Sequence, residues 1–249
     1  MPDYRRVRMS AQRNGWAALA LGLCIAFGLV GAGLVGGQAA LAVKSLERSV
    51  VVKGLSEREV PADTVIWPIS FQLAGNDLVA LFDSISSQSA QVERFLLENG
   101  LPQADFSRGA PQVTDLHAQQ YGDKSQIRYR YTAQATVTVY SQNVEATRQA
   151  MGNLVELGKR GVVVGANYYG NGGTQFLYTG LSDLKPEMIE EATRTARAVA
   201  EKFAQDSDSH LGKIRQASQG QFSISDRDAS TPHIKTVRVV STVEYYLSD

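Results

Sequence analysis

The feature that most constrains this chain is a long uncharged segment near its beginning, preceded by arginines. Across residues 14–43, no side chain ionises except the thiol of Cys24. Crossing a hydrocarbon core of about 30 Å takes about 20 helical residues. Residues 16–36 supply that length, and Trp16 stands where an interfacial aromatic residue is expected. The segment therefore predicts one N-terminal transmembrane helix, which we place at residues 16–37.

The charges that flank this segment predict its orientation. Arg5, Arg6, Arg8 and Arg13 all precede the apolar run. Basic residues stay on the cytoplasmic side of single-pass proteins. We therefore expect residues 1–15 in the cytoplasm and the bulk of the chain across the membrane.

A cleaved signal peptide is the competing interpretation. Its apolar region is typically about 7–15 residues long and ends in small residues. The run here is longer, which favours a retained anchor, but "ALA" at residues 40–42 still offers a cleavage site. A lipoprotein is rejected because the "LGL" before Cys24 puts leucine where a lipobox needs a small residue.

Composition excludes one class of partner and one kind of crosslink. Lysine and arginine together number 25, as do aspartate and glutamate, so the formal charge is zero. A nucleic-acid binder normally has a basic excess, so no nucleic-acid partner is expected. Cys24 is the one cysteine, so an intramolecular disulfide cannot form. The absence of cysteine from the rest of the chain suits an oxidising compartment.

Periodicity predicts an α+β fold with mostly antiparallel sheet and packed helices, preceded by the transmembrane helix. Alternating residues predict strands at 49–53, 65–73, 107–117, 127–139, 214–224 and 235–247, and residues 158–183 hold strand material broken by glycines. Helical spacing predicts helices from an N-cap at Asn76 or Asp77 to about Asn99, at 144–157, and from an N-cap at Asp183 to about Phe203. Trp67 is expected to be buried, and Pro68 to mark a sheet edge or bulge. The predicted order is β-β-α-β-β-α-β-α-β-β.

No motif in the chain predicts catalysis or metal binding. His117, His210 and His233 are scattered, and no second ligand stands at metal spacing. "DSDSH" at residues 206–210 lacks the glycine and distal glutamate of a calcium loop, and a helix C-terminal turn explains it better. Asp226 and Asp228 flank Arg227 in what we expect to be a solvated hairpin loop. We therefore expect no enzyme activity, no catalytic, cofactor-binding or metal-binding residues, and no cofactor.

Three stretches resemble the SIMPL-domain family. "SVVVKGLSEREVPADTVIWPISF" resembles its opening, a strand and a glycine followed by a second strand that starts near Pro and Asp, here Gly54, Pro61 and Asp63. "YRYTAQATVTV" is similar to its central strand. Residues 180–224 are similar to its Ala/Arg-rich helix, Leu-Gly pair and following strand. The resemblance covers residues 49–249.

The resemblance implies a bacterial envelope protein with an α+β SIMPL domain that tends to form ring-like or cage-like oligomers. It implies no established activity and no agreed ligand, and it links some relatives to stress tolerance. Many relatives look secreted after signal cleavage, whereas this chain looks anchored. The family offers no catalytic positions to transfer.

Our first hypothesis is a non-enzymatic, single-pass protein of the bacterial inner membrane, with a linker at residues 38–48 and a periplasmic SIMPL-like domain at residues 49–249. It would act as a homo-oligomer or bind an unknown envelope protein, through an exposed strand edge or helix face. One alternative is a hydrolase with a dispersed site such as Asp63, His117 and Asp226. Another is a secreted ligand-binding or chaperone-like module whose groove is lined by aromatics of residues 167–176.

Overall fold

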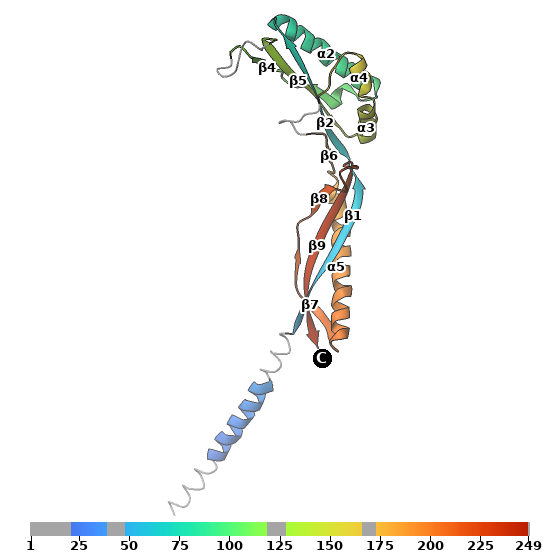
Figure 1. The fold of residues 1–249 in the computed structure, drawn as a ribbon. Helices are drawn as coiled ribbons and strands as arrows, with labels where there is room; N and C mark the ends of the chain where they lie inside the picture. Colours follow the sequence, from blue (N-terminus) through green and yellow to red (C-terminus); the bar gives the residue numbers. More distant parts are fainter. Residues whose placement is uncertain (1–20, 39–47, 119–127, 166–172, 249) are drawn as a thin grey trace, which may run out of the picture. The chain divides into compact units, whose positions relative to one another are not determined.

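The computed structural model describes residues 21–38, 48–118, 128–165 and 173–248 (Figure 1). Its contacts group the chain into two compact units. The first comprises Met1–Leu55, Ala192–Gly220 and Ser241–Asp249, and the second comprises Ser56–Glu191 and Gln221–Val240. Each unit is described by itself below.

The apolar segment near the beginning of the chain forms a helix over Leu21–Gln38. Its mean hydropathy is 1.7, and its side chains are exposed. Its length and composition suffice to cross a membrane, and a signal sequence meets the same criteria. Residues 16–20 of the predicted span, and the "ALA" stretch, lie outside the described residues.

The second unit contains a five-stranded sheet with the order β3-β5-β2-β6, in which β4 also pairs with β5. The strands are β2 (Thr64–Gly75), β3 (Phe106–Arg108), β4 (Gln112–Asp115), β5 (Tyr131–Ser141) and β6 (Gln175–Leu177). All the pairings are antiparallel. One face of β2 and β5 is buried against helices through alternate apolar residues, and this face builds the main core. Its members on the two strands are Val65, Trp67, Ile69, Phe71, Ala133, Ala135, Val137 and Val139.

Helix α2 (Leu78–Glu98) covers that apolar face and packs on both β2 and β5. Of the two predicted caps, Asp77 is the one used, because its Oδ1 accepts hydrogen bonds from the backbone N–H groups of Val79 and Ala80. Its buried side chains recur at helical spacing and include Leu81, Ile85, Val92, Phe95 and Leu96. The helix ends at Glu98 with Asn99 as its C-cap, and Gly100 follows with φ of +83°, a conformation that favours glycine.

A second sheet has the order β1-β9-β7, with β8 also paired to β9. Its strands are β1 (Ser49–Pro61), β7 (His210–Gln219), β8 (Ser223–Asp226) and β9 (Ile234–Ser248). In the first unit, α5 (Leu181–Asp206) packs on this sheet through alanines. Ala196 and Ala200 are fully buried and form a core with Val52, Val243 and Tyr245.

Gly54 of β1 lets the α5 backbone lie directly on the sheet. A Cβ atom at this position would meet the carbonyl oxygen of Ala192 at 1.8 Å and the nitrogen of Ala196 at 2.5 Å. Both distances lie far below the 3.4 Å at which ordinary contact begins. Helix and strand can therefore reach this separation only without a side chain at residue 54.

The structure confirms the α+β class with antiparallel sheet but changes several element boundaries. Helix α5 begins at Leu181, so Asp183 is a first-turn residue and not the N-cap, and Pro186 lies inside the helix. The predicted helix 144–157 is two helices, α3 (Val144–Gly152) and α4 (Val155–Lys159). The predicted strands 107–117 and 214–224 are each divided, into β3 with β4 and β7 with β8.

Pro68 was expected to mark a sheet edge or bulge, but β2 lies between β5 and β6 in the sheet order and pairs with β5 without a register shift. The expectation of an edge holds only at the residue itself. Strand β2 pairs with β6 only over Thr64–Ile66, and Phe71 then bridges to Val164. Pro68 lies between these two points and opposite Thr138 of β5. Among the described strands it therefore has a neighbour on one side only, where a missing N–H is tolerated. Trp67 is buried, as predicted.

Candidate functional site

Asp63, one of the residues considered for a dispersed active site, anchors the start of α5. Its Oδ2 accepts hydrogen bonds from the backbone N–H groups of Thr179 at 2.7 Å and Gly180 at 3.0 Å, and from Thr179 Oγ1 at 3.1 Å. Its Oδ1 accepts one from Thr64 Oγ1 at 2.9 Å. Thr179 and Gly180 directly precede α5, where an anion is favoured by the helix dipole.

The protonation behaviour of Asp63 fits this structural role. Burial alone would raise the pKa of the Asp63 carboxyl, but the hydrogen bonds from Thr179, Thr64 and Gly180 outweigh it and hold the pKa below its usual value. An ionised carboxylate with four donors already in place has little capacity left to accept a proton. The arrangement suits a fixed cap better than a general base.

His117 and Asp226 make contacts unrelated to those of Asp63. The backbone N–H of His117 donates to Asp115 Oδ1. Asp226 pairs with Lys235, its neighbour across the β8–β9 pairing. No described contact therefore joins Asp63, His117 and Asp226. The part of the chain that the structure describes also contains no group of three or more His, Cys, Asp or Glu residues suited to a metal ion.

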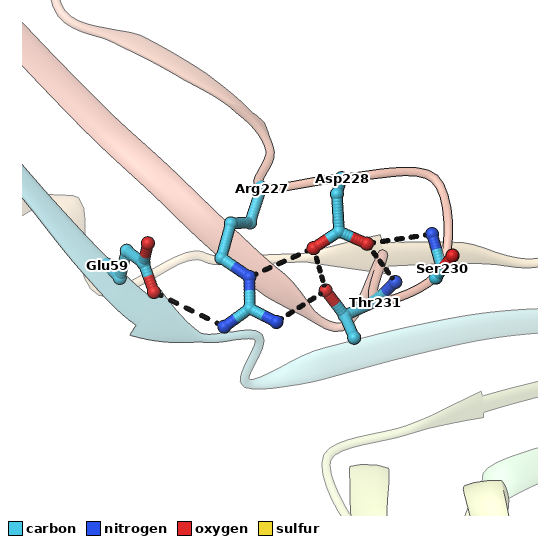
Figure 2. A network of polar contacts seen from close by, with 5 residues as sticks. All are labelled: Glu59, Arg227, Asp228, Ser230 and Thr231. Carbon is cyan, nitrogen blue, oxygen red and sulfur yellow. Dashed lines mark hydrogen bonds and ion pairs between the residues drawn. The ribbon is translucent and has the colours of Figure 1, made fainter.

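Arg227 and Asp228 lie in a polar turn, as expected, whereas Asp226 is the last residue of β8 and not part of the loop (Figure 2). Asp228 accepts hydrogen bonds from the backbone N–H groups of Ser230 and Thr231, and from the Thr231 hydroxyl. Arg227 donates to Asp228, to Thr231 Oγ1 and to Glu59 of β1. These bonds hold the pKa of Asp228 well below its usual range. Each charged group here is already satisfied by a neighbour, so the turn is a connection between strands.

Residues 206–210 also form the expected turn at the end of a helix. Helix α5 ends at Asp206, and Asp208 has a positive φ of 51°. The backbone N–H of Ser209 donates to the Ala204 carbonyl at 2.8 Å. The chain then enters β7 at His210.

A cavity of about 630 Å³ lies beside β2 and is lined mainly by apolar residues that include Trp67, Leu154, Val155 and Val163. Its lining also includes Gly165 and Gly173. Residues 166–172 between them, which hold most of the aromatic stretch considered for a groove, lie outside the described residues. Phe176 of the same stretch is buried and lies edge-on to the His233 ring. We assign no role to this cavity.

The outer strands of the second sheet expose the most evident candidate for an interaction surface in the first unit. Strand β7 pairs with β9 on one side and with no other described strand. Every residue of β7 is exposed except Leu211, which is half-buried and packs against the core that Ala196 and Ala200 of α5 help to form. Strand β1 is the other outer strand, and on its exposed face Val51 and Leu55 are 60% and 42% accessible.

Strand β7 carries protection against nonspecific pairing in one half only. Its register shifts between Leu211 and Ile214, and again between Ile214 and Gln216, and that half carries Lys213 and Arg215. Bulges and basic residues are common ways of blocking a sheet edge. Residues 216–219 pair regularly with β9 and are uncharged. We define residues 216–219 of β7 and residues 49–55 of β1 as the open edges.

The chain belongs to the SIMPL family, described as proteins of unknown function (DUF541), because the family model matches residues 50–245. No curated protein matches the chain. Two residues that carried the resemblance now have structural explanations. Gly54 admits the α5 backbone, and Asp63 caps α5.

Sequence analysis missed the open edge of β7, although the signal is present. The stretch "HLGKIRQASQ" lacks the apolar alternation of the other long strands. A strand that is polar on both faces is typical of one that no helix covers. The polar composition therefore indicated exposure on both sides as well as strand structure.

Proposed function

We propose that this chain is a membrane-anchored SIMPL-domain protein that acts without catalysis, through self-assembly or by binding an envelope partner. The apolar helix Leu21–Gln38 would hold it in the bacterial inner membrane, with the SIMPL domain in the periplasm. The positive-inside rule supports that orientation. Stress tolerance, which the family resemblance suggested, is the process in which we would look for a deletion phenotype.

The open edges are the observation that carries this proposal. An unpaired edge presents backbone N–H and C=O groups that another strand can satisfy. The order β1-β9-β7 places the two open edges on opposite sides of one sheet. The β1 edge of one copy would therefore pair with the β7 edge of the next. Such head-to-tail contacts give a ring if the rotation closes and a filament if it does not.

Light scattering on the full chain in detergent at micromolar concentration tests the proposal. We expect a mass above that of the monomer for the native chain and a monomer for Ala217→Lys, which adds a charge within the regular part of β7. Ala198→Lys is the matched control, because Ala198 is exposed on α5, away from the strand edges. It should leave the mass unchanged.

The possible results separate the parts of the proposal. A native chain that stays monomeric would refute self-assembly and leave partner binding as the form to pursue. An oligomer that survives Ala217→Lys would show that the contact uses another surface. An oligomer disrupted equally by Ala198→Lys would indicate a general charge effect instead of edge pairing.

A further inference from the structure

The face of the five-stranded sheet opposite α2 carries a groove that the proposed function does not use. The groove has a volume of about 370 Å³, within the range of small-ligand sites. It is lined by Gln72, Leu73, Ala74, Gln112, Thr114, Thr132, Ala133 and Gln134. None of these residues carries a charge.

Strand register places the three glutamines side by side. Gln72 of β2 lies opposite Gln134 of β5, and Gln134 lies opposite Gln112 of β4. Residues opposite one another on antiparallel strands have Cβ atoms about 5 Å apart and point to the same face. The three primary amides therefore form one row across three adjacent strands.

A second row runs beside the first, two residues along each strand. It consists of Ala74, Thr132 and Thr114, again in register across β2, β5 and β4. The small Ala74 leaves space at one end of the row, whereas Thr132 and Thr114 present hydroxyl groups. The groove floor thus has one row of three amides and, beside it, a row with two hydroxyls.

The hydrogen-bonding capacity of these rows is not used by the rest of the described chain. Each glutamine has two N–H donors and one carbonyl acceptor, and each threonine hydroxyl both donates and accepts. The neighbouring row differs, because Ser70 and Thr136 bond each other at 2.8 Å. The side chains of Gln72, Gln134, Gln112, Thr132 and Thr114 make no hydrogen bond with a described residue. These uncharged side chains offer both donors and acceptors. They would therefore complement an uncharged ligand that itself carries both donors and acceptors.

We propose that this groove binds a neutral saccharide. Each hydroxyl of a sugar ring donates and accepts, so it matches amides and hydroxyls arranged in rows. A phosphate or carboxylate ligand would want a basic residue, and the groove lining has none. The inference is independent of self-assembly, because the groove lies in the second unit and the open edges lie in the first.

Calorimetric titration of the full chain in detergent tests this inference, with neutral tetrasaccharides of glucose and of N-acetylglucosamine as probes and tetragalacturonic acid as an anionic comparison. We expect at least one neutral probe to bind. Gln134→Ala, which removes the central amide, should weaken that binding by about tenfold, since one or two hydrogen bonds are lost. Gln142→Ala is the control, because Gln142 is exposed and lies outside the groove lining.

Each other outcome overturns the inference. No binding by any neutral probe would refute it, as would binding that Gln134→Ala and Gln142→Ala change equally. Tighter binding of tetragalacturonic acid than of its neutral counterparts would show that charge outweighs the amide rows. A loss of oligomer mass in Gln134→Ala, measured by light scattering, would assign this face to a second copy of the chain. Circular dichroism of both variants checks that the fold is retained.

Discussion

Replacing Gly54 with alanine should separate α5 from β1 and destabilise the first unit. The added Cβ would start 1.8 Å from the Ala192 carbonyl oxygen, and it needs at least 3.4 Å. The obstructing atoms belong to a helix backbone, so no side-chain rotation can relieve the clash. Overpacking of a core typically costs about 1–3 kcal/mol, and we expect a value near or above the upper end.

Hydrogen exchange of the full chain in detergent locates and measures this effect. A loss of about 3 kcal/mol corresponds to exchange on the order of 100-fold faster for amides that open with the first unit. We expect this acceleration for the α5 amides of residues 192–204, and no comparable change for those of α2. The contrast matters because a general loss of folding would accelerate both helices.

Gly158→Ala provides a matched control for this substitution. A Cβ at Gly158 would meet nothing within 4 Å, and the residue lies in α4. Alanine in a helix is favoured over glycine by about 0.5–1 kcal/mol, so this variant should be as stable as the native chain or slightly more stable. If the α5 amides of Gly54→Ala exchanged at the native rate, the inference that α5 and β1 are too close for a side chain at residue 54 would be wrong.

Four further predictions follow from single residues or segments. Asp63→Ala should lower the free energy of unfolding by about 1–3 kcal/mol at pH 7 in denaturant titrations. Because the folded pKa of Asp63 is depressed, its contribution should be complete above about pH 4 and disappear as the pH falls through the folded pKa, so native chain and variant should converge in acid. Leu96→Ala, at a position with 0% exposure, should cost about 2–5 kcal/mol by the same assay. Arg227→Ala should give no resolvable change in melting temperature, because its ion pairs are exposed, and a large drop would contradict that view. Fractionation with N-terminal mass determination should find an intact N terminus in alkali-washed membranes, whereas a soluble chain starting near Val43 would show that the apolar segment is removed.

Local patterns predicted the elements whose apolar period is strong and uninterrupted. Helix α2 and the buried face of β5 followed from spacing alone, whereas the choice of Asp77 over Asn76 as the cap came from the structure. The start of β5 was placed too early, because residues 128–130 continue the alternation without forming strand in the structure. Alternation marks which face can be buried, and pairing with a neighbour decides where the strand begins.

The features that required three-dimensional knowledge join distant parts of the chain. Asp183 looked like the N-cap of α5, but the start of that helix is anchored by Asp63, 116 residues away from Thr179. The role of Gly54 depends on which helix lies over it, and the amide row of Gln72, Gln134 and Gln112 depends on strand register. Sequence spacing contains none of this information, because register and packing partners are chosen by the whole fold.

The pairing of β1 with β9 has a consequence for the order in which the chain can fold. These strands begin at Ser49 and Ile234, and β9 is the central strand of its sheet. During synthesis the sheet cannot close until nearly all of the intervening chain has been made, because its middle strand arrives last. Helices and the β2–β5 pairing can form earlier, since their contacts are closer in sequence. The sheet of β1, β9 and β7 therefore stays incomplete for most of the synthesis of the chain, even where the β2–β5 sheet has already formed.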